Sequence, residues 1–130
     1  MIVLVCGGSD YGHTDHKEQA HIYSVLNTLN TDSAIDIVVS SCSKGTDTQA
    51  MLWAGDNNIM VHVHSTNWTK YGKSAEPRRN AEMLKSEDVD LVVAFPGSAG
   101  TQDMIHKAIT KGIEVMYCDK PSINQNQVVL

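Results

Sequence analysis

Aromatic residues are scarce in this sequence, and several features that define other protein classes are missing. Phe, Trp and Tyr make up 5% of the 130 residues, and there are only three prolines. No apolar run approaches the roughly 20 residues that cross a bilayer. The first residues, MIVLVCGG, lack the positively charged segment of a signal peptide. The sequence therefore predicts a cytoplasmic protein with no membrane partner.

Cysteine is also rare, with Cys6, Cys42 and Cys118 far apart and no C-x-x-C spacing. An odd count without that spacing argues against a disulfide framework or a zinc site. Three buried free thiols are expected instead, because a free cysteine packs as a small hydrophobe. His62 and His64 alternate along one strand but lack an evident third ligand. We therefore expect no metal and no cofactor.

Positive charge is limited as well, since the formal net charge is -5. Binding to a phosphate backbone needs clustered Lys and Arg side chains. The one basic cluster is short and consists of Lys70, Lys73, Arg78 and Arg79. This pattern disfavours a nucleic-acid partner and is more typical of a site for one small anion.

What the sequence does contain is a regular alternation of apolar runs and helical patterns. The runs are Ile2–Cys6, Asp36–Val39, Met60–Val63, Leu91–Phe95 and Glu114–Tyr117. Most are continuous, as in parallel strands that are buried on both faces. Because 42% of the residues are hydrophobic, one domain can bury a real core. We predict a single Rossmann-like, doubly wound α/β domain over residues 1–120. Its five-stranded, mostly parallel sheet carries helices on both faces, and residues 121–130 form a tail.

The helical patterns lie between the runs and keep the spacing of one apolar helix face. Their apolar positions are Ile22, Val25, Leu26 and Leu29; Ala50, Met51 and Ala54; Ala81 and Leu84; and Met104, Ile105, Ala108 and Ile109. Pro77 falls near the start of the third helix, where a missing N–H costs little. Gly112 is expected to end the fourth.

Polar loops follow four of the apolar runs, with the sequences GGSDYG, SSCSKGTD, HSTNWTKYGKSAEPRRN and PGSAGTQD. Open α/β sheets bind ligands beyond the carboxyl ends of their strands, near the switch in strand order. These loops are therefore expected to share one rim and to form the binding site.

The loop PGSAGT at residues 96–101 has the composition of an anion site. Gly97 and Gly100 let backbone N–H groups approach a ligand, and the following helix start carries free N–H groups. Thr101 either caps the helix or contacts phosphate. The alternative is an ordinary tight turn, with Asp103 placed favourably for the helix dipole.

Two other glycine-containing loops are less specific. GGSDYG at residues 7–12 is not G-x-G-x-x-G, and no acid follows the second strand to bind a ribose, so the dinucleotide fingerprint is absent. In KGTDTQA, Thr46 or Asp47 can cap a helix, whereas Lys44 beside Gly45 could add charge to an anion site.

The segment NWTKYGKSAEPRRN is predicted to be a long loop, and such loops are often functional. Trp68 and Tyr71 could stack on a base, and Arg78 and Arg79 could bind phosphate. The alternative is that Trp68 closes the edge of the core and the arginines are solvated.

Taken in order, these segments resemble a known family. GGSDY, KGTD, W-x-x-x-G, P-x-R-N and AFPGSAGTQDM look like the YspA-type, YpsA-related branch of the SLOG superfamily, over about residues 2–117. The resemblance implies a Rossmann-like fold, a nucleotide-derived ligand and a homodimer or higher homo-oligomer. Relatives include LOG enzymes, which cleave nucleoside monophosphates with an Arg and a Glu, nucleotide-signal sensors and a DNA-binding branch.

This sequence departs from the family pattern at Ser9, Ser41, Cys42, Glu76 and Ser98, where the family usually has Arg or Gly. These changes remove a cation or add side chains at the rim, and a larger ligand tolerates them better than a monophosphate does. Asp103 also stands one position before the place of the LOG glutamate.

Two functions follow from the resemblance. The first is binding of a nucleotide-derived signal, such as an ADP-ribose derivative or a cyclic nucleotide, with sequestration of this signal by a viral counter-defence protein as one form of this role. The alternative is a LOG-like phosphoribohydrolase with Asp103 and Arg79 as the catalytic pair. The candidate ligand-binding residues are Gly7, Gly8, Ser9, Asp10, Lys44, Gly45, Thr46, Trp68, Tyr71, Arg78, Arg79, Asn80, Pro96, Gly97, Ser98, Gly100 and Thr101. The face of Ile22, Val25 and Leu26, or the tail, is the candidate dimer surface.

Overall fold

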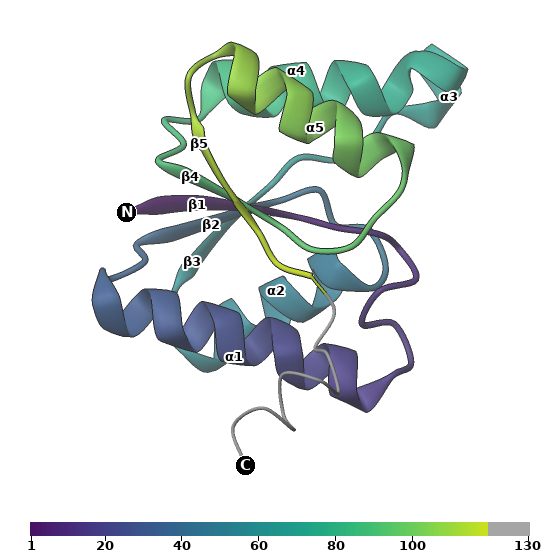
Figure 1. Ribbon diagram of the computed structural model, residues 1–130. Helices are drawn as coiled ribbons and strands as arrows, with labels where there is room; N and C mark the ends of the chain where they lie inside the picture. Colours follow the sequence, from purple (N-terminus) through teal and green to yellow (C-terminus); the bar gives the residue numbers. More distant parts are fainter. Residues whose placement is uncertain (120–130) are drawn as a thin grey trace.

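The computed structural model describes residues 1–119 and contains one parallel sheet between two layers of helices (Figure 1). The strands are β1 (Ile2–Cys6), β2 (Ile37–Ser40), β3 (Met60–Val63), β4 (Leu91–Ala94) and β5 (Glu114–Tyr117). The helices are α1 (His16–Asp32), α2 (Thr46–Asp56), α3 (Trp68–Tyr71), α4 (Ala75–Ser86) and α5 (Ala99–Thr110), with a 3₁₀ turn, η1, at Gly72–Ser74. The predicted doubly wound fold and its five strands are confirmed. The predicted tail lies outside the described residues.

The strand order is β3-β2-β1-β4-β5, and every neighbouring pair is parallel. The chain therefore builds outward from β1 in one direction and then returns to add β4 and β5 on the other side. Helices α1 and α2 cover one face of the sheet, and α4 and α5 cover the other (Figure 1). The change of direction lies between β1 and β4, where an open sheet has its binding crevice.

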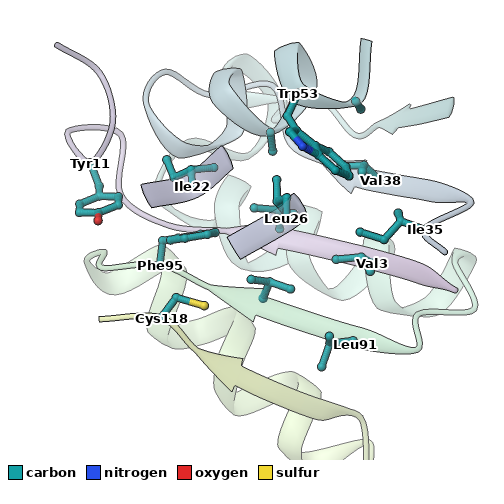
Figure 2. Close-up of a cluster of buried hydrophobic side chains, with 14 residues drawn as sticks. Val3, Tyr11, Ile22, Leu26, Ile35, Val38, Trp53, Leu91, Phe95 and Cys118 are labelled. Carbon is teal, nitrogen blue, oxygen red and sulfur yellow. The ribbon is translucent and has the colours of Figure 1, made fainter. Parts of the chain in front are cut away.

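Two apolar clusters hold these layers together. The first lies under α1 and α2, where Ile22, Leu26 and Trp53 pack on the sheet (Figure 2). The second lies under α4 and α5 and includes Met83 and Met104. Ile22 and Leu26 are fully buried inside the chain, so the predicted use of their helix face as a dimer surface is wrong.

The edge strands differ from the predicted pattern. β1 and β4 are buried on both faces, as expected, but β3 and β5 are largely exposed. Met60 is 62% exposed and Tyr117 is 61% exposed. A continuous apolar run does not separate an edge strand from a central strand, because its length and composition can be the same in both positions.

The predicted long loop before Asn80 is also wrong, because this segment folds into α3, η1 and the start of α4. The Asn67 side chain caps α3 by accepting a hydrogen bond from the Lys70 N–H at 3.0 Å. Pro77 lies in the first turn of α4, where its missing N–H has no helical partner. Gly112, with a φ of 77°, follows the end of α5 as predicted.

All three thiols are free; Cys118 is buried, Cys6 is partly buried and Cys42 is exposed. Burial raises the pKa of Cys6 to about 12 and that of Cys118 to about 11. Both are therefore unreactive thiols. Cys42 is exposed, so the prediction that it is buried is wrong. It lies in a surface turn between β2 and α2.

Within residues 1–119, no helix is long and apolar enough to cross a membrane. The same part of the chain contains no group of three potential ligand side chains arranged around a metal position. His62 and His64 instead hydrogen-bond the two oxygens of the Glu87 carboxylate, at 2.9 and 2.6 Å.

Candidate functional site

The loops after β1 and β4 meet at the point where the strand order changes. The Gly8 N–H donates a hydrogen bond to the Pro96 carbonyl at 2.8 Å. Gly97 lies so close to this contact that a Cβ there would be 2.8 Å from the Gly8 nitrogen and would overlap the Thr101 side chain. The glycine is thus required by packing between loops. Its predicted role of opening the backbone to a ligand is not needed to explain it.

A small cavity of about 70 Å³ opens beside these loops on the side of α4 and α5; we call it the inner cavity. Its walls contain the predicted residues Gly7, Gly8, Ser9, Arg79, Asn80, Ser98, Gly100 and Thr101. Its deeper wall is apolar and includes Leu4, Met83 and Met104. A single water molecule needs about 10–15 Å³ of cavity volume, so the inner cavity has room for several water-sized groups, such as one part of a nucleotide.

A second recess of about 270 Å³ adjoins the inner cavity; we call it the outer recess. The two share Gly8, Ser9 and Ser98 as walls. The outer recess adds the predicted residues Asp10, Pro96 and Gly97. The loops after β1 and β4 therefore separate two compartments that together have room for a larger ligand.

The basic segment forms a third hollow, the α4 groove, of about 530 Å³. Tyr71 and Arg78 line this groove, and Arg79 lies in the walls of both the groove and the inner cavity. The Arg78 guanidinium covers the Tyr71 ring at 4.5 Å from its centre, so this ring is already stacked. Trp68 is 55% exposed and lines neither the inner cavity nor the groove.

Arg79 is the cation of the inner cavity. Its guanidinium donates to the Thr66 hydroxyl at 2.8 Å and to the Asn80 side-chain oxygen at 2.8 and 3.2 Å. Both acceptors are neutral, and Arg79 forms no ion pair with a carboxylate of residues 1–119. Its orientation is therefore fixed without a direct ion pair, and the guanidinium remains able to bind an incoming anion, although the Asp47 and Glu76 carboxylates lie in the same cavity wall.

The start of α5 forms the adjacent wall. No side chain caps this helix, and no acid lies in its first turn. The free N–H groups and the helix dipole make this end electropositive. The Glu76 carboxylate of α4 lies close to it, in the space that a side chain at position 100 would take. A partly buried acid from another helix thus offsets part of the positive charge at the start of α5.

Asp47 is the functional candidate that the sequence reasoning missed. It lines the inner cavity and is only 4% exposed. Its Oδ2 atom accepts hydrogen bonds from the Ser41 hydroxyl and from the Ser43 N–H, the latter at 3.2 Å. Burial raises the pKa of Asp47, against the effect of these hydrogen bonds and of the Arg79 charge. An acid therefore does lie at the end of β2, because the side chain of Asp47, in the first turn of α2, reaches back to Ser41.

The segment around Asp47 also corrects the predicted helix cap. Gly45 is the N-cap of α2, and no side chain caps it. The Thr46 hydroxyl instead donates to the carbonyls of Gly8 and Tyr11, at 3.3 and 3.2 Å, and holds the loop after β1. Lys44 is exposed and is not part of the inner cavity. The KGTD segment is the sequence signal for Asp47, but an acid at the start of a helix also fits a cap, so the sequence alone does not assign it to the cavity.

Asp103 does not line the inner cavity. Its carboxylate accepts a hydrogen bond from Lys107 at 2.6 Å and one from the Asn80 side chain at 3.0 Å. Burial acts in the opposite direction, but these bonds lower the pKa of Asp103. Asn80 also donates to the Gly100 carbonyl at 3.1 Å, so the group ties α4 to α5.

Comparison with known proteins assigns a family to this architecture. The model of the YspA, cpYpsA-related SLOG family matches residues 1–71. The chain belongs to this family. Membership in the SLOG family indicates nucleotide-related binding. The matched part carries the loops after β1 and β2, whereas residues 96–101 lie beyond it.

Two further similarities accompany the SLOG assignment. The gene 61 protein of Mycobacterium phage D29 is 33% identical over 93 residues, which cover 65% of this chain and 74% of that protein. The X-ray structure of DNA processing protein A (DprA) from Streptococcus pneumoniae is similar at 19% identity with a TM-score of 0.49. That alignment covers 88% of this chain and 57% of the DprA chain, so this chain spans little more than half of its length.

Proposed function

We propose that the inner cavity and the outer recess together bind one small nucleotide-derived signalling molecule, of the ADP-ribose or cyclic-nucleotide type. One observation carries this proposal: Arg79, without a carboxylate partner in residues 1–119, lies in the same cavity wall as the uncapped start of α5. Both features attract a phosphate. The adjoining recess of about 270 Å³ gives space for the rest of the molecule.

The charge of Glu76 leads to a prediction about the direction in which ligand affinity changes when this charge is removed. Its carboxylate lies beside Gly100, where the phosphate is expected, so it must turn away when the phosphate binds. Repulsion between like charges opposes binding. Removal of the Glu76 charge should therefore strengthen binding, whereas removal of the Arg79 charge should weaken it.

The position of Asp103 argues against the catalytic pair that it would form with Arg79, and for this reason we infer a binding role. A phosphoribohydrolase needs a free carboxylate next to the sugar. The Asp103 carboxylate is paired with Lys107 and is absent from the cavity wall. The binding role we infer is sequestration of the signal. The origin of the gene 61 protein in a phage supports a role as a viral counter-defence protein.

The test is retention of ligands from a defined mixture. The purified protein is incubated with AMP, IMP, NAD, ADP-ribose, cyclic ADP-ribose isomers and cyclic dinucleotides. Free ligand is removed, the protein is denatured, and both fractions are analysed by chromatography. A compound that leaves the solution and is released intact identifies a binder. Free base and ribose phosphate that accumulate with time would instead identify the hydrolase.

Three variants then test the site with the retained compound. Arg79→Gln should weaken binding by about 10- to 100-fold, the usual value of a hydrogen-bonded charge. Glu76→Gln should strengthen binding. The matched control is Arg78→Gln, which removes the neighbouring charge in the α4 groove and should change affinity less than threefold. Equal effects of the two arginine variants would show that binding does not involve the inner cavity, and retention of no compound would contradict the proposed function.

A further inference from the structure

Asp47 has an unusual environment for a charged side chain. It is 4% exposed, yet it forms part of the wall of the inner cavity. The Ser41 hydroxyl and the Ser43 N–H both donate to Oδ2, and the Ser43 side chain is a third polar group beside the carboxylate. Within residues 1–119, no donor bonds to Oδ1. A carboxylate has about four acceptor positions, so Oδ1 is free to accept from a molecule in the cavity.

The charge of Asp47 restricts what this molecule can place there. A phosphate beside a buried carboxylate is repelled, and this repulsion is strong where little water screens it. A neutral O–H or N–H donor instead satisfies the free oxygen, which is costly to leave without a partner. The phosphate therefore belongs at Arg79 and the start of α5, and a neutral donor belongs at Asp47.

The position and walls of the inner cavity favour a sugar as the source of that donor. In a nucleotide the sugar is attached directly to the phosphate, so it lies next to the phosphate site, and Leu4, Met83 and Met104 form an apolar wall that suits the C–H groups of its ring. A sugar attached to the phosphate can reach inward past Arg79, while the base extends into the outer recess. Asp47 then contacts the sugar and Arg79 contacts the phosphate of the same molecule.

We propose that Asp47 Oδ1 accepts a hydrogen bond from a ribose hydroxyl of the ligand and makes the site selective for ribonucleotides over deoxyribonucleotides. The inference rests on the proposed function, because it assigns the sugar of the same nucleotide-derived ligand. It also gives a function to the buried acid at the end of β2.

The experiment compares the affinity of the full chain for AMP and ADP-ribose with that for their 2′-deoxy and 3′-deoxy forms, by isothermal titration calorimetry. Loss of the contacted hydroxyl should weaken binding to the wild-type protein by about 10- to 100-fold, as expected for a hydrogen bond to a charged group. Asp47→Asn should reduce this ratio to less than threefold. Asparagine keeps an oxygen that can accept from Ser41 and Ser43, so the fold should be retained, and a thermal melt checks this.

The outcomes separate this inference from the proposed function. If wild-type protein binds neither AMP nor ADP-ribose, nor any compound of the mixture above, the proposed function itself is overturned. If wild-type protein binds a probe but does not distinguish it from both deoxy forms, only the role of Asp47 is overturned, and this result needs no variant. An unchanged ribose preference in folded Asp47→Asn protein would also overturn it.

Discussion

The two faces of the sheet differ in the side chains that pack at the edge formed by the carboxyl ends of its strands. On the face of α1 and α2, Tyr11 and Phe95 fill this edge, with their rings stacked at 6.1 Å between centres (Figure 2). The Tyr11 hydroxyl is hydrogen-bonded to His21 at 2.6 Å. Burial is the main cause that raises the pKa of Tyr11, to about 12. Large aromatic side chains thus fill the space under α1, and the outer recess lies beyond them, with Tyr11 in its wall.

On the face of α4 and α5, the same edge is left partly open. Its apolar cluster contains no aromatic residue among those described and relies on Met83, Leu84 and Met104. Beyond this cluster lies the inner cavity with Asp47 and Arg79. The three buried aromatic residues of the described chain, Tyr11, Trp53 and Phe95, therefore all lie in the cluster under α1 and α2, whereas Asp47 and Arg79 lie in the wall of the inner cavity.

This contrast indicates a division of roles between the two layers. A close-packed layer loses stability when its volume changes, whereas a layer with a cavity tolerates variation near that cavity. We expect substitutions under α1 and α2 to act on folding, and those beside the cavity to act on binding or on the loops that shape it. Three substitutions test this division, in order of decreasing effect.

The largest loss is expected for Trp53→Ala. Trp53 is fully buried under α2, and its indole N–H donates to the Asn27 side chain at 2.8 Å. Removal of such a side chain lowers the free energy of unfolding by about 3–5 kcal/mol. Urea denaturation measures this value. The matched control is the neighbouring Leu52→Ala, which should change stability by less than about 0.5 kcal/mol because Leu52 is 53% exposed. Similar losses for both would contradict the division.

An intermediate effect is expected for Gly97→Ala. The new Cβ would overlap Thr101 and lie 2.8 Å from the Gly8 nitrogen, so the loops after β1 and β4 must separate. Overpacking of this kind costs about 1–3 kcal/mol, and the distorted loops should also weaken binding at the inner cavity. Thermal melts and titration measure the two effects.

Gly55→Ala is the matched control for this substitution. A Cβ at position 55, near the end of α2, meets nothing within 4 Å. Alanine favours a helix over glycine by about 0.5–1 kcal/mol, so this variant should be more stable and bind normally. If Gly97→Ala were as stable as Gly55→Ala, the loop contact would not be required.

Those parts of the fold that depend on the local pattern of apolar residues could be predicted from the sequence alone. The spacing of Ile22, Leu26 and Leu29 predicted α1, and continuous apolar runs predicted all five strands within one residue at each end. The loops after these strands identified the correct edge for the inner cavity. Both results follow from periodicity and from the geometry of parallel sheets, which do not depend on contacts with particular distant residues.

The remaining features depend on contacts between distant residues. The exposure of β3 follows from its place at the edge of the sheet, since β3 and β2 each contain three apolar residues of four. Asp47 reaches Ser41 only because the turn before α2 folds back. The pairing of Asp103 with Lys107 is local, at i and i+4, and could have been predicted. The absence of Asp103 from the wall of the inner cavity could not have been predicted, because it depends on how α5 packs on α4.

The smallest effect is expected at Glu87, and it concerns how α4 is attached to the sheet. The Glu87 carboxylate joins the end of α4 to His62 and His64 of the β3 segment. Burial alone would raise the pKa of Glu87, but hydrogen bonds from His64 and His62 lower it below its ordinary value. A carboxyl group whose pKa is depressed by folding stabilises the folded state above its unfolded pKa, about 4.3. This contribution is lost as the pH falls through the lower folded value.

Glu87→Gln should therefore reduce the free energy of unfolding by about 1 kcal/mol at neutral pH, as for one partly buried charged hydrogen bond. The difference from wild-type protein should shrink as the pH falls below about 4, because protonated Glu87 no longer differs in charge from glutamine. Urea denaturation at pH 7, 5 and 3.5 measures it. The control is Glu82→Gln on the exposed side of α4, which should show no such pH dependence. A difference that persists unchanged at pH 3.5 would mean that packing of the side chain, and not its charge, attaches α4 to β3.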